Sequence, residues 1–161
     1  MKWMDVAKSL VGTKEIKGSK HNPVILGWAK GLGGWIGDYY TKDEIPWCGL
    51  FVAHCIHAAG LSFSQKSLSA RSWNDWGQKC EPQYGAIMVF SRNGGGHVGF
   101  YISEDSTAYN ILGGNQSDSV NIARVAKNRF LGARWPKELP VPKAKPTIVQ
   151  KLSNFFSKNE A

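Results

Sequence analysis

The first part of the chain carries its hydrophobic residues at the spacing of short amphipathic helices. Residues 3–11 place apolar side chains along one helical face, which predicts a helix at the start of the chain. Asn22 is a favourable N-cap and Pro23 suits a first helical position, so a second helix is predicted over residues 23–30. Residues 31–37 are rich in glycine and are predicted to form a loop, because glycine disfavours helix.

A third predicted helix, from Pro46 to Gly60, is hydrophobic on nearly all sides. Pro46 suits the first helical turn, and Gly60 suits the position just past a helix end. Between them, Leu50, Phe51 and Ile56 help to cover every face with apolar side chains, which is typical of a buried helix. We interpret this helix as the element around which the rest of the chain is organised.

The hydrophobic pattern changes from helical to strand spacing after about Tyr84. A short helix over residues 70–76, capped by Ser69, comes before the change, and residues 93–96 are typical of a hairpin turn. The predicted strands cover residues 85–90, 97–102, 107–112, 120–125 and 130–135. Helices followed by antiparallel strands favour an α+β fold in which N-terminal helices pack in a layer on an antiparallel β-sheet.

The chain of 161 residues is predicted to form one folded domain followed by a tail. We assign residues 1–138 to the domain and residues 139–146, which hold three prolines and two lysines, to a stiff linker. Residues 147–161 have apolar side chains at helical spacing with lysines among the polar positions. They are predicted to form a basic amphipathic helix.

Composition and charge narrow the choice of compartment and partner. Hydrophobic residues make up 42% of the chain and the formal net charge is +8, so a soluble protein with an anionic partner is expected. The three cysteines are irregularly spaced and imply no disulfide framework. The N-terminus lacks the apolar segment of a signal peptide, and no apolar run has the length of a membrane span. We therefore expect synthesis in the cytoplasm with reduced thiols.

Cys48 is the first candidate for chemistry. It lies in the first turn of the buried helix, where peptide dipoles and free N–H groups favour an anion. A thiol there is expected to have a lowered pKa and to be a competent nucleophile. The alternative is that Cys48 is a small residue of the hydrophobic core.

His97 is the best candidate for the base that a thiol nucleophile needs, because it opens a strand directly after a glycine-rich turn. Asn115 follows the next strand and is the candidate that orients the imidazole through its side-chain oxygen. The alternative for Asn115 is a turn residue in a left-handed conformation, with Gln116 and Asp118 as substitutes in the orienting role.

Other chemistries fit the sequence less well. Cys48, His54, Cys55 and His57 are crowded in one segment, but they lack paired spacing and do not share one helix face, so no metal site and no cofactor are expected. The glycine-rich loops precede strands instead of opening helices, which argues against a phosphate site. The basic residues are scattered, so no nucleic acid is expected as a partner.

The ordered set of motifs resembles the CHAP and NlpC-type papain-like cysteine peptidases, and most closely the compact phage and bacterial cell-wall lytic proteins of endolysin type. The resemblance covers residues 4–136 and rests first on residues 46–48, 96–101 and 112–117. Residues 14–16, 22–23, 70–73 and 131–136 add to it in the same order.

The resemblance implies a role for each matching residue. Cys48 would be the nucleophile, His97 the general base and later acid, and Asn115 the orienting residue. Many CHAP domains have a glutamate two residues before that asparagine, where this chain has Gly113. The helix N-terminus would help to hold the oxyanion. Substrate contacts would come from Trp47, Glu44, Arg71, Trp73 and Gln116.

The resemblance also implies an antimicrobial peptidoglycan hydrolase, and a monomer is the default expectation for the oligomeric state. The bond would be either the N-acetylmuramoyl–L-alanine amide or an amide of the stem peptide. Without a signal peptide, the protein would reach the cell wall through a holin-made hole or an equivalent route; a phage, a prophage or a secretion-system effector is compatible with this.

Two alternatives come from other classes of protein. The basic tail, residues 147–161, would allow a non-enzymatic protein that disrupts an anionic membrane, or would help passage across an outer membrane. A catalytically inactive wall-binding module is the third reading, and the presence of both nucleophile and base disfavours it.

Overall fold

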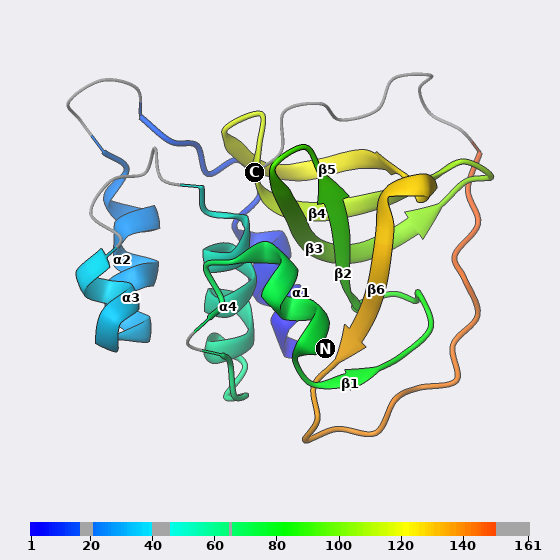
Figure 1. Ribbon diagram of the computed structural model, residues 1–161, viewed down its shortest axis with the longest axis horizontal. Helices are drawn as coiled ribbons and strands as arrows, with labels where there is room; N and C mark the ends of the chain where they lie inside the picture. The colour runs from blue at the N-terminus through cyan, green and yellow to red at the C-terminus, as the bar shows by residue number, and fades with distance from the viewer. Residues whose placement is uncertain (17–20, 40–45, 65, 151–161) are drawn as a thin grey trace.

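The computed structural model describes residues 1–16, 21–39, 46–64 and 66–150 (Figure 1). Helices dominate the first part of the chain and strands the second, as the hydrophobic pattern predicted. The elements in chain order are α1 (Lys2–Ser9), α2 (Pro23–Leu32), α3 (Gly34–Tyr39), α4 (Cys48–Ala58), the 3-10 helix η1 (Ala70–Asp75), β1 (Gln78–Lys79), β2 (Ile87–Arg92), β3 (Gly95–Glu104), β4 (Ala108–Gln116), β5 (Ser119–Ala126), the 3-10 helix η2 (Lys127–Arg129) and β6 (Phe130–Trp135).

The strands form one antiparallel sheet of six strands in the order β1-β6-β2-β3-β4-β5. Strands β2 to β5 pair with their neighbours in sequence, and β6 returns to pair with the free side of β2. In this register, Phe90 of β2 lies opposite His97 of β3. The central strands thus hold His97 well inside the sheet and not at its outer edge.

The helices lie on one side of the molecule and the sheet on the other, with α4 between them (Figure 1). Helix α4 packs on β3 and β4, while α1 and α2 pack against α4. Eight residues of α4 are buried. This arrangement confirms the predicted α+β class and the central place of the helix that begins at Cys48.

Helix α3 corrects one prediction, because residues 31–37 were expected to form a loop. Gly33 has a φ of 72° and ends α2, and the chain then turns directly into α3. A Cβ on Gly37 would lie 3.3 Å from the carbonyl oxygen of Ala29, so glycine permits the two short helices to approach closely. Ile36 is fully buried between them and the core, which offsets the low helix propensity of the glycines.

Strand β4 is longer than predicted and carries an irregularity at its end. It runs to Gln116, and its pairing with β5 shifts register between Gly113 and Gln116. Asn115 has a φ of 55°, a left-handed conformation that asparagine tolerates better than most residues. The turn is confined to Ser117 and Asp118, so Asn115 and Gln116 belong to the sheet and not to a loop.

The chain after β6 runs around the outside of the sheet (Figure 1). Ile148 forms a parallel bridge with Glu104, and the amide N–H of Glu104 donates to the carbonyl of Thr147 at 2.8 Å. Residues 147–150 are therefore not helical, in contrast to the expected tail helix, and the rest of that segment, residues 151–161, lies outside the described residues. In the described part of the chain, no helix has both the length and the apolar character to cross a membrane.

Candidate active site

Cys48 is the first residue of α4, directly after the N-cap Trp47. The first-turn N–H groups of a helix have no intrahelical partner, so they are available to an anion beside the thiol. A Cβ on Gly49 would lie 2.0 Å from the carbonyl oxygen of Ser67, so only glycine fits where this loop crosses the helix start. The side chain of Cys48 is almost fully buried, with 3% of its surface exposed.

The electrostatics of Cys48 differ from the sequence prediction. Burial raises the pKa of the Cys48 thiol from 9.0 to about 11. Hydrogen bonding from the backbone N–H groups of Val98, Gly49 and Cys48 itself, together with the positive charge of Arg92, lowers that pKa but does not outweigh burial. The helix N-terminus was expected to leave Cys48 as a thiolate. The thiol is instead protonated at neutral pH and needs a base.

His97 lies on β3, a strand against which α4 packs, and is fully buried. The hydrogen bond from the Val98 amide to Cys48 places the sulfur against the residue that follows His97. The imidazole also stacks on Phe90 of the neighbouring strand, with ring centroids 6.4 Å apart. This stacking restricts the ring to a narrow range of orientations.

Gln116 binds the imidazole. Its Oε1 lies 2.8 Å from Nε2 of His97. The Nε2 of Gln116 donates to the carbonyl of Ile111 at 3.2 Å, to the carbonyl of Asn121 at 2.8 Å and to Oδ1 of Asn121 at 2.9 Å. These acceptors fix the amide with its oxygen toward His97, so we assign the imidazole proton to Nε2. The lone pair is then on Nδ1, the other ring nitrogen.

Asn115 occupies a different place from the one expected for the orienting residue. It is buried and lies in the bulge of β4, and the residue after it reaches the imidazole. Its left-handed backbone changes the direction of the strand immediately before Gln116. Asn115 thus has the left-handed conformation that was expected of a turn residue. Gln116, which was the expected substitute in the orienting role, supplies the side-chain oxygen that binds His97.

Three of the expected substrate contacts are not at an accessible surface of the described structure. Trp47 is fully buried and donates from Nε1 to Oε1 of Glu15 at 3.2 Å. Trp73 is 1% exposed and donates from Nε1 to the carbonyl of Ser67 at 2.9 Å. Gln116 is 1% exposed. Glu44, the fourth expected contact, lies outside the described residues.

Arg71 is the expected contact that does remain exposed. Its Nε donates to the carbonyl of Gly95 at 2.7 Å. Its side chain lies over Gly96, where an added Cβ would be 2.6 Å from Cγ of Arg71. Arg71 therefore supports the turn that leads into His97, while its exposed part remains available to a substrate.

The other histidines of α4 have structural partners. His54 stacks on Trp28 with ring centroids 5.2 Å apart, and burial lowers its pKa. His57 packs edge-on against Phe63. Within the ranges that the structure describes, no three or more His, Cys, Asp or Glu side chains are grouped so that they could hold a metal ion.

Two residues near the site were missed by sequence reasoning. Arg92 at the end of β2 contributes positive charge at Cys48, and Asn121 of β5 holds the Gln116 amide. Asn121 lies opposite Gly113 in the β4–β5 pairing, so a correct strand register would have brought it to the site. Nothing in the sequence around Arg92 distinguishes it from the other scattered basic residues.

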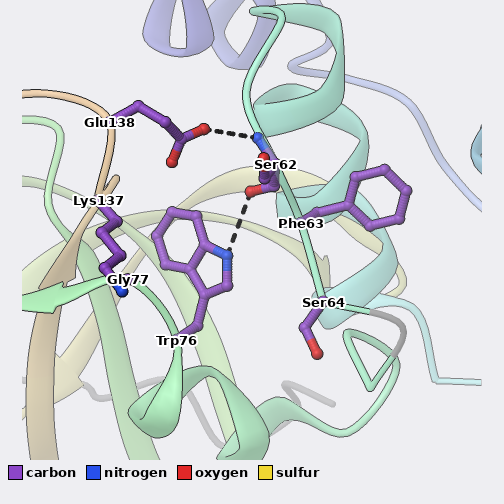
Figure 2. Close-up of a pocket in the computed structure, with 7 residues that line it drawn as sticks. All are labelled: Ser62, Phe63, Ser64, Trp76, Gly77, Lys137 and Glu138. Carbon is purple, nitrogen blue, oxygen red and sulfur yellow. Dashed lines mark hydrogen bonds between the residues drawn. The ribbon is translucent and has the colours of Figure 1, made fainter.

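A separate hollow of about 460 Å³ lies at the other end of α4 from Cys48 (Figure 2). Its polar groups bind one another: the carboxylate of Glu138 accepts from the Ser62 amide at 2.9 Å, and Trp76 donates from Nε1 to the Ser62 carbonyl at 3.2 Å. The bond between Glu138 and Ser62 fastens the chain after β6 to the loop after α4, and the bond from Trp76 fastens the end of η1 to the same loop. The lining residues are Ser62, Phe63, Ser64, Trp76, Gly77, Lys137 and Glu138.

The fold and the site together define a class. N-terminal helices packed on an antiparallel sheet, with a cysteine at the start of the central helix, are consistent with the papain-like fold of CHAP domains. The family model of the CHAP domain matches residues 40–115, a segment that holds Cys48, His97 and Asn115. The predicted resemblance to CHAP and NlpC-type papain-like peptidases is thereby confirmed. A CHAP domain suggests a hydrolase with peptidoglycan as its substrate. No curated protein matches the chain.

The two buried cysteines of α4 should differ in reactivity. Cys48 has backbone N–H groups and a positive charge near its sulfur, whereas Cys55 is fully buried and burial raises its pKa well above 9.0. In a Cys80→Ala background, which removes the more exposed thiol, iodoacetamide should modify Cys48 at least about tenfold faster than Cys55. Peptide mass spectrometry gives both rates, and equal rates would identify Cys48 as an ordinary core residue.

Proposed function

We propose that the protein is a phage endolysin-like peptidoglycan hydrolase that cleaves an amide bond of the bacterial cell wall, with Cys48 as nucleophile and His97 as general base. One observation carries the proposal. The Cys48 thiol lies against the residue that follows His97, at the start of a helix, and the imidazole is held by a hydrogen bond at its far nitrogen. These two interactions support Cys48 as the nucleophile, His97 as its base and Gln116 as the group that holds the base.

The proposed reaction follows from the protonation states. Because the pKa of the Cys48 thiol is about 11, the thiol proton moves to Nδ1 of His97 as the sulfur attacks the amide carbon. The negative charge then develops on the amide oxygen, and first-turn N–H groups of α4 stabilise it. The imidazolium donates its proton to the leaving amine, which breaks the C–N bond and leaves a thioester on Cys48. Water, deprotonated by His97, hydrolyses the thioester and regenerates the thiol.

The substrate bond is an amide of peptidoglycan, either between N-acetylmuramic acid and L-alanine or within the stem peptide. The positive net charge of +8 favours association with the acidic polymers of the wall. We propose a monomer that is made in the host cytoplasm and reaches the wall after release by a holin or an equivalent. A prophage or effector origin is compatible with the same chemistry.

The competing function is membrane disruption by the basic tail, which is favoured by the charge and the apolar spacing of residues 147–161. Residues 147–149 are tied to Glu104 by backbone hydrogen bonds, so a truncation that ends at Gln150 removes residues 151–161 of the tail and preserves this contact. The truncated protein should release free amines from purified peptidoglycan at a rate within about twofold of the full chain, because the removed segment contributes none of Cys48, His97 or Gln116.

The control for this truncation is leakage from vesicles of anionic lipid. If the tail is the active part, the truncated protein loses its effect on cells and vesicles together, and neither form of the protein releases amines from peptidoglycan. That outcome would contradict the proposed hydrolase. If the truncated protein still releases amines from peptidoglycan, the tail has at most an accessory role.

A further inference from the structure

We infer that Gln116 is the positioning residue that sets the reactive tautomer of His97, and that Asn121 holds Gln116 in place. The inference rests on the proposed function of His97 as a base. A glutamine amide can bind the imidazole in either of two orientations, with opposite consequences for the tautomer. The hydrogen bonds on the far side of the amide remove this ambiguity.

The amide of Gln116 is fixed by acceptors at its nitrogen. Two backbone carbonyls and Oδ1 of Asn121 surround Nε2, and an amide oxygen at that position would face only other oxygens. Asn121 is itself fixed, because its Nδ2 donates to the Gln116 carbonyl at 2.8 Å and to Oγ of Ser119 at 2.9 Å. Its Oδ1 therefore faces the Gln116 amide nitrogen. Each side chain in the series Ser119, Asn121, Gln116 and His97 thus has a fixed donor or acceptor facing the next.

The bulge in β4 is what brings Gln116 to the imidazole. Gly113 and Gln116 are three residues apart, so in a regular strand their side chains would point to opposite faces. The register shift and the left-handed Asn115 return Gln116 to the face of Gly113. A Cβ on Gly113 would lie 2.7 Å from Oε1 of Gln116 and 3.5 Å from Nε2 of His97, so the amide fills the space that glycine leaves.

A neutral amide suits the resting state of this site. Because burial keeps the Cys48 thiol protonated, the base must be a neutral imidazole with its lone pair on Nδ1. An amide oxygen selects that tautomer without adding the negative charge that would raise the pKa of His97. Without Gln116, the buried Nε2–H would lose its acceptor, and the tautomer protonated on Nδ1 would become populated.

The test is nitrogen-15 NMR of the His97 ring in the full chain, recorded with peptidoglycan kinetics for the same variants. In wild type, Nε2 should carry the proton. In Gln116→Ala the two tautomers should mix, and kcat should fall by roughly a hundredfold with a smaller change in KM, because correctly placed base catalysis contributes about that much. Gly113→Ala should move both readouts in the same direction, because its methyl group displaces the amide oxygen.

Gln116→Glu separates positioning from folding, because it keeps the size and the acceptor. Its tautomer should match wild type, while the carboxylate raises the pKa of His97, so the acid limb of the pH–kcat profile should move to higher pH. In Asn121→Ala, the population of the His97 tautomer protonated on Nε2 should lie between its values in wild type and in Gln116→Ala. Gln83→Ala is the matched control, since Gln83 is a buried glutamine that bonds to Glu81 and should leave both readouts unchanged.

An unchanged His97 tautomer and a kcat near wild type in both Gln116→Ala and Gly113→Ala would overturn the inference. So would a Gln116→Glu variant whose His97 pKa does not rise. If no protein in the series hydrolyses peptidoglycan but the tautomer still changes with Gln116, the proposed function fails and the positioning role stands. The two ideas are thus tested by different readouts of the same samples.

Discussion

Cys48→Ala is expected to abolish peptidoglycan hydrolysis, with a loss of about 10⁴-fold or more in kcat. The thiol is the group that forms the bond to the substrate carbonyl, and no other cysteine can replace it, because Cys55 lies two helical turns deeper in the core and Cys80 lies after η1. The substitution removes one buried sulfur atom, so the free energy of unfolding should fall by only about 1 kcal/mol. Release of free amines from purified peptidoglycan measures the activity.

Cys55→Ala is the matched control for this experiment. It removes the same atom from the same helix at a fully buried position, where burial raises the pKa of the thiol and leaves it unreactive. Its hydrolysis rate should stay close to that of wild type after correction for any loss of stability. An alanine variant at position 48 that remains as active as the Cys55 variant would remove Cys48 from the mechanism.

His97→Gln should lower activity by roughly 10³-fold at pH 8, and the loss should shrink as the pH rises. With the pKa of the Cys48 thiol at about 11, only about one thiol in 10³ is ionised at pH 8 without a base. The ionised fraction then grows tenfold with each pH unit, up to the pKa. Wild type should lack this steep dependence, because His97 removes the proton during the attack.

The control for His97→Gln is His54→Gln. His54 lies in the same helix as Cys48 and stacks on Trp28, and it should affect stability more than hydrolysis. The pH–rate profile of each variant between pH 6 and 10 decides the outcome. A His97 variant with full activity at pH 8, or one whose loss does not vary with pH, would contradict the role of His97 as the base.

The spacing of apolar residues within a single helix or strand predicted the parts of the fold in which that helix or strand is buried. The helix at Cys48 is apolar all round, and the structure buries it between the sheet and α1 and α2. The strands followed from their apolar runs and from the glycine turn before His97. In each case a residue's own neighbours in sequence determine its surroundings, so a short window of sequence was enough.

The rest of the fold and site depends on contacts between segments that are distant in sequence. Helix α3 forms against its glycine content because Ile36 is buried by other elements. The His97–Gln116 bond joins residues 19 positions apart and requires a bulge that no local pattern marks. The pKa of Cys48 was predicted in the wrong direction because the effect of the helix N-terminus was given more weight than burial, which the apolar pattern of the helix had already predicted.

Mass spectrometry of purified peptidoglycan after digestion tests the central claim most directly. Wild type should produce fragments in which one amide has gained the elements of water, and the new amine should lie either at L-alanine or within the stem peptide, which identifies the bond. Cys48→Ala under the same conditions should leave the polymer intact. Undigested peptidoglycan with wild type, or the same fragments with Cys48→Ala, would contradict a cysteine hydrolase of the cell wall.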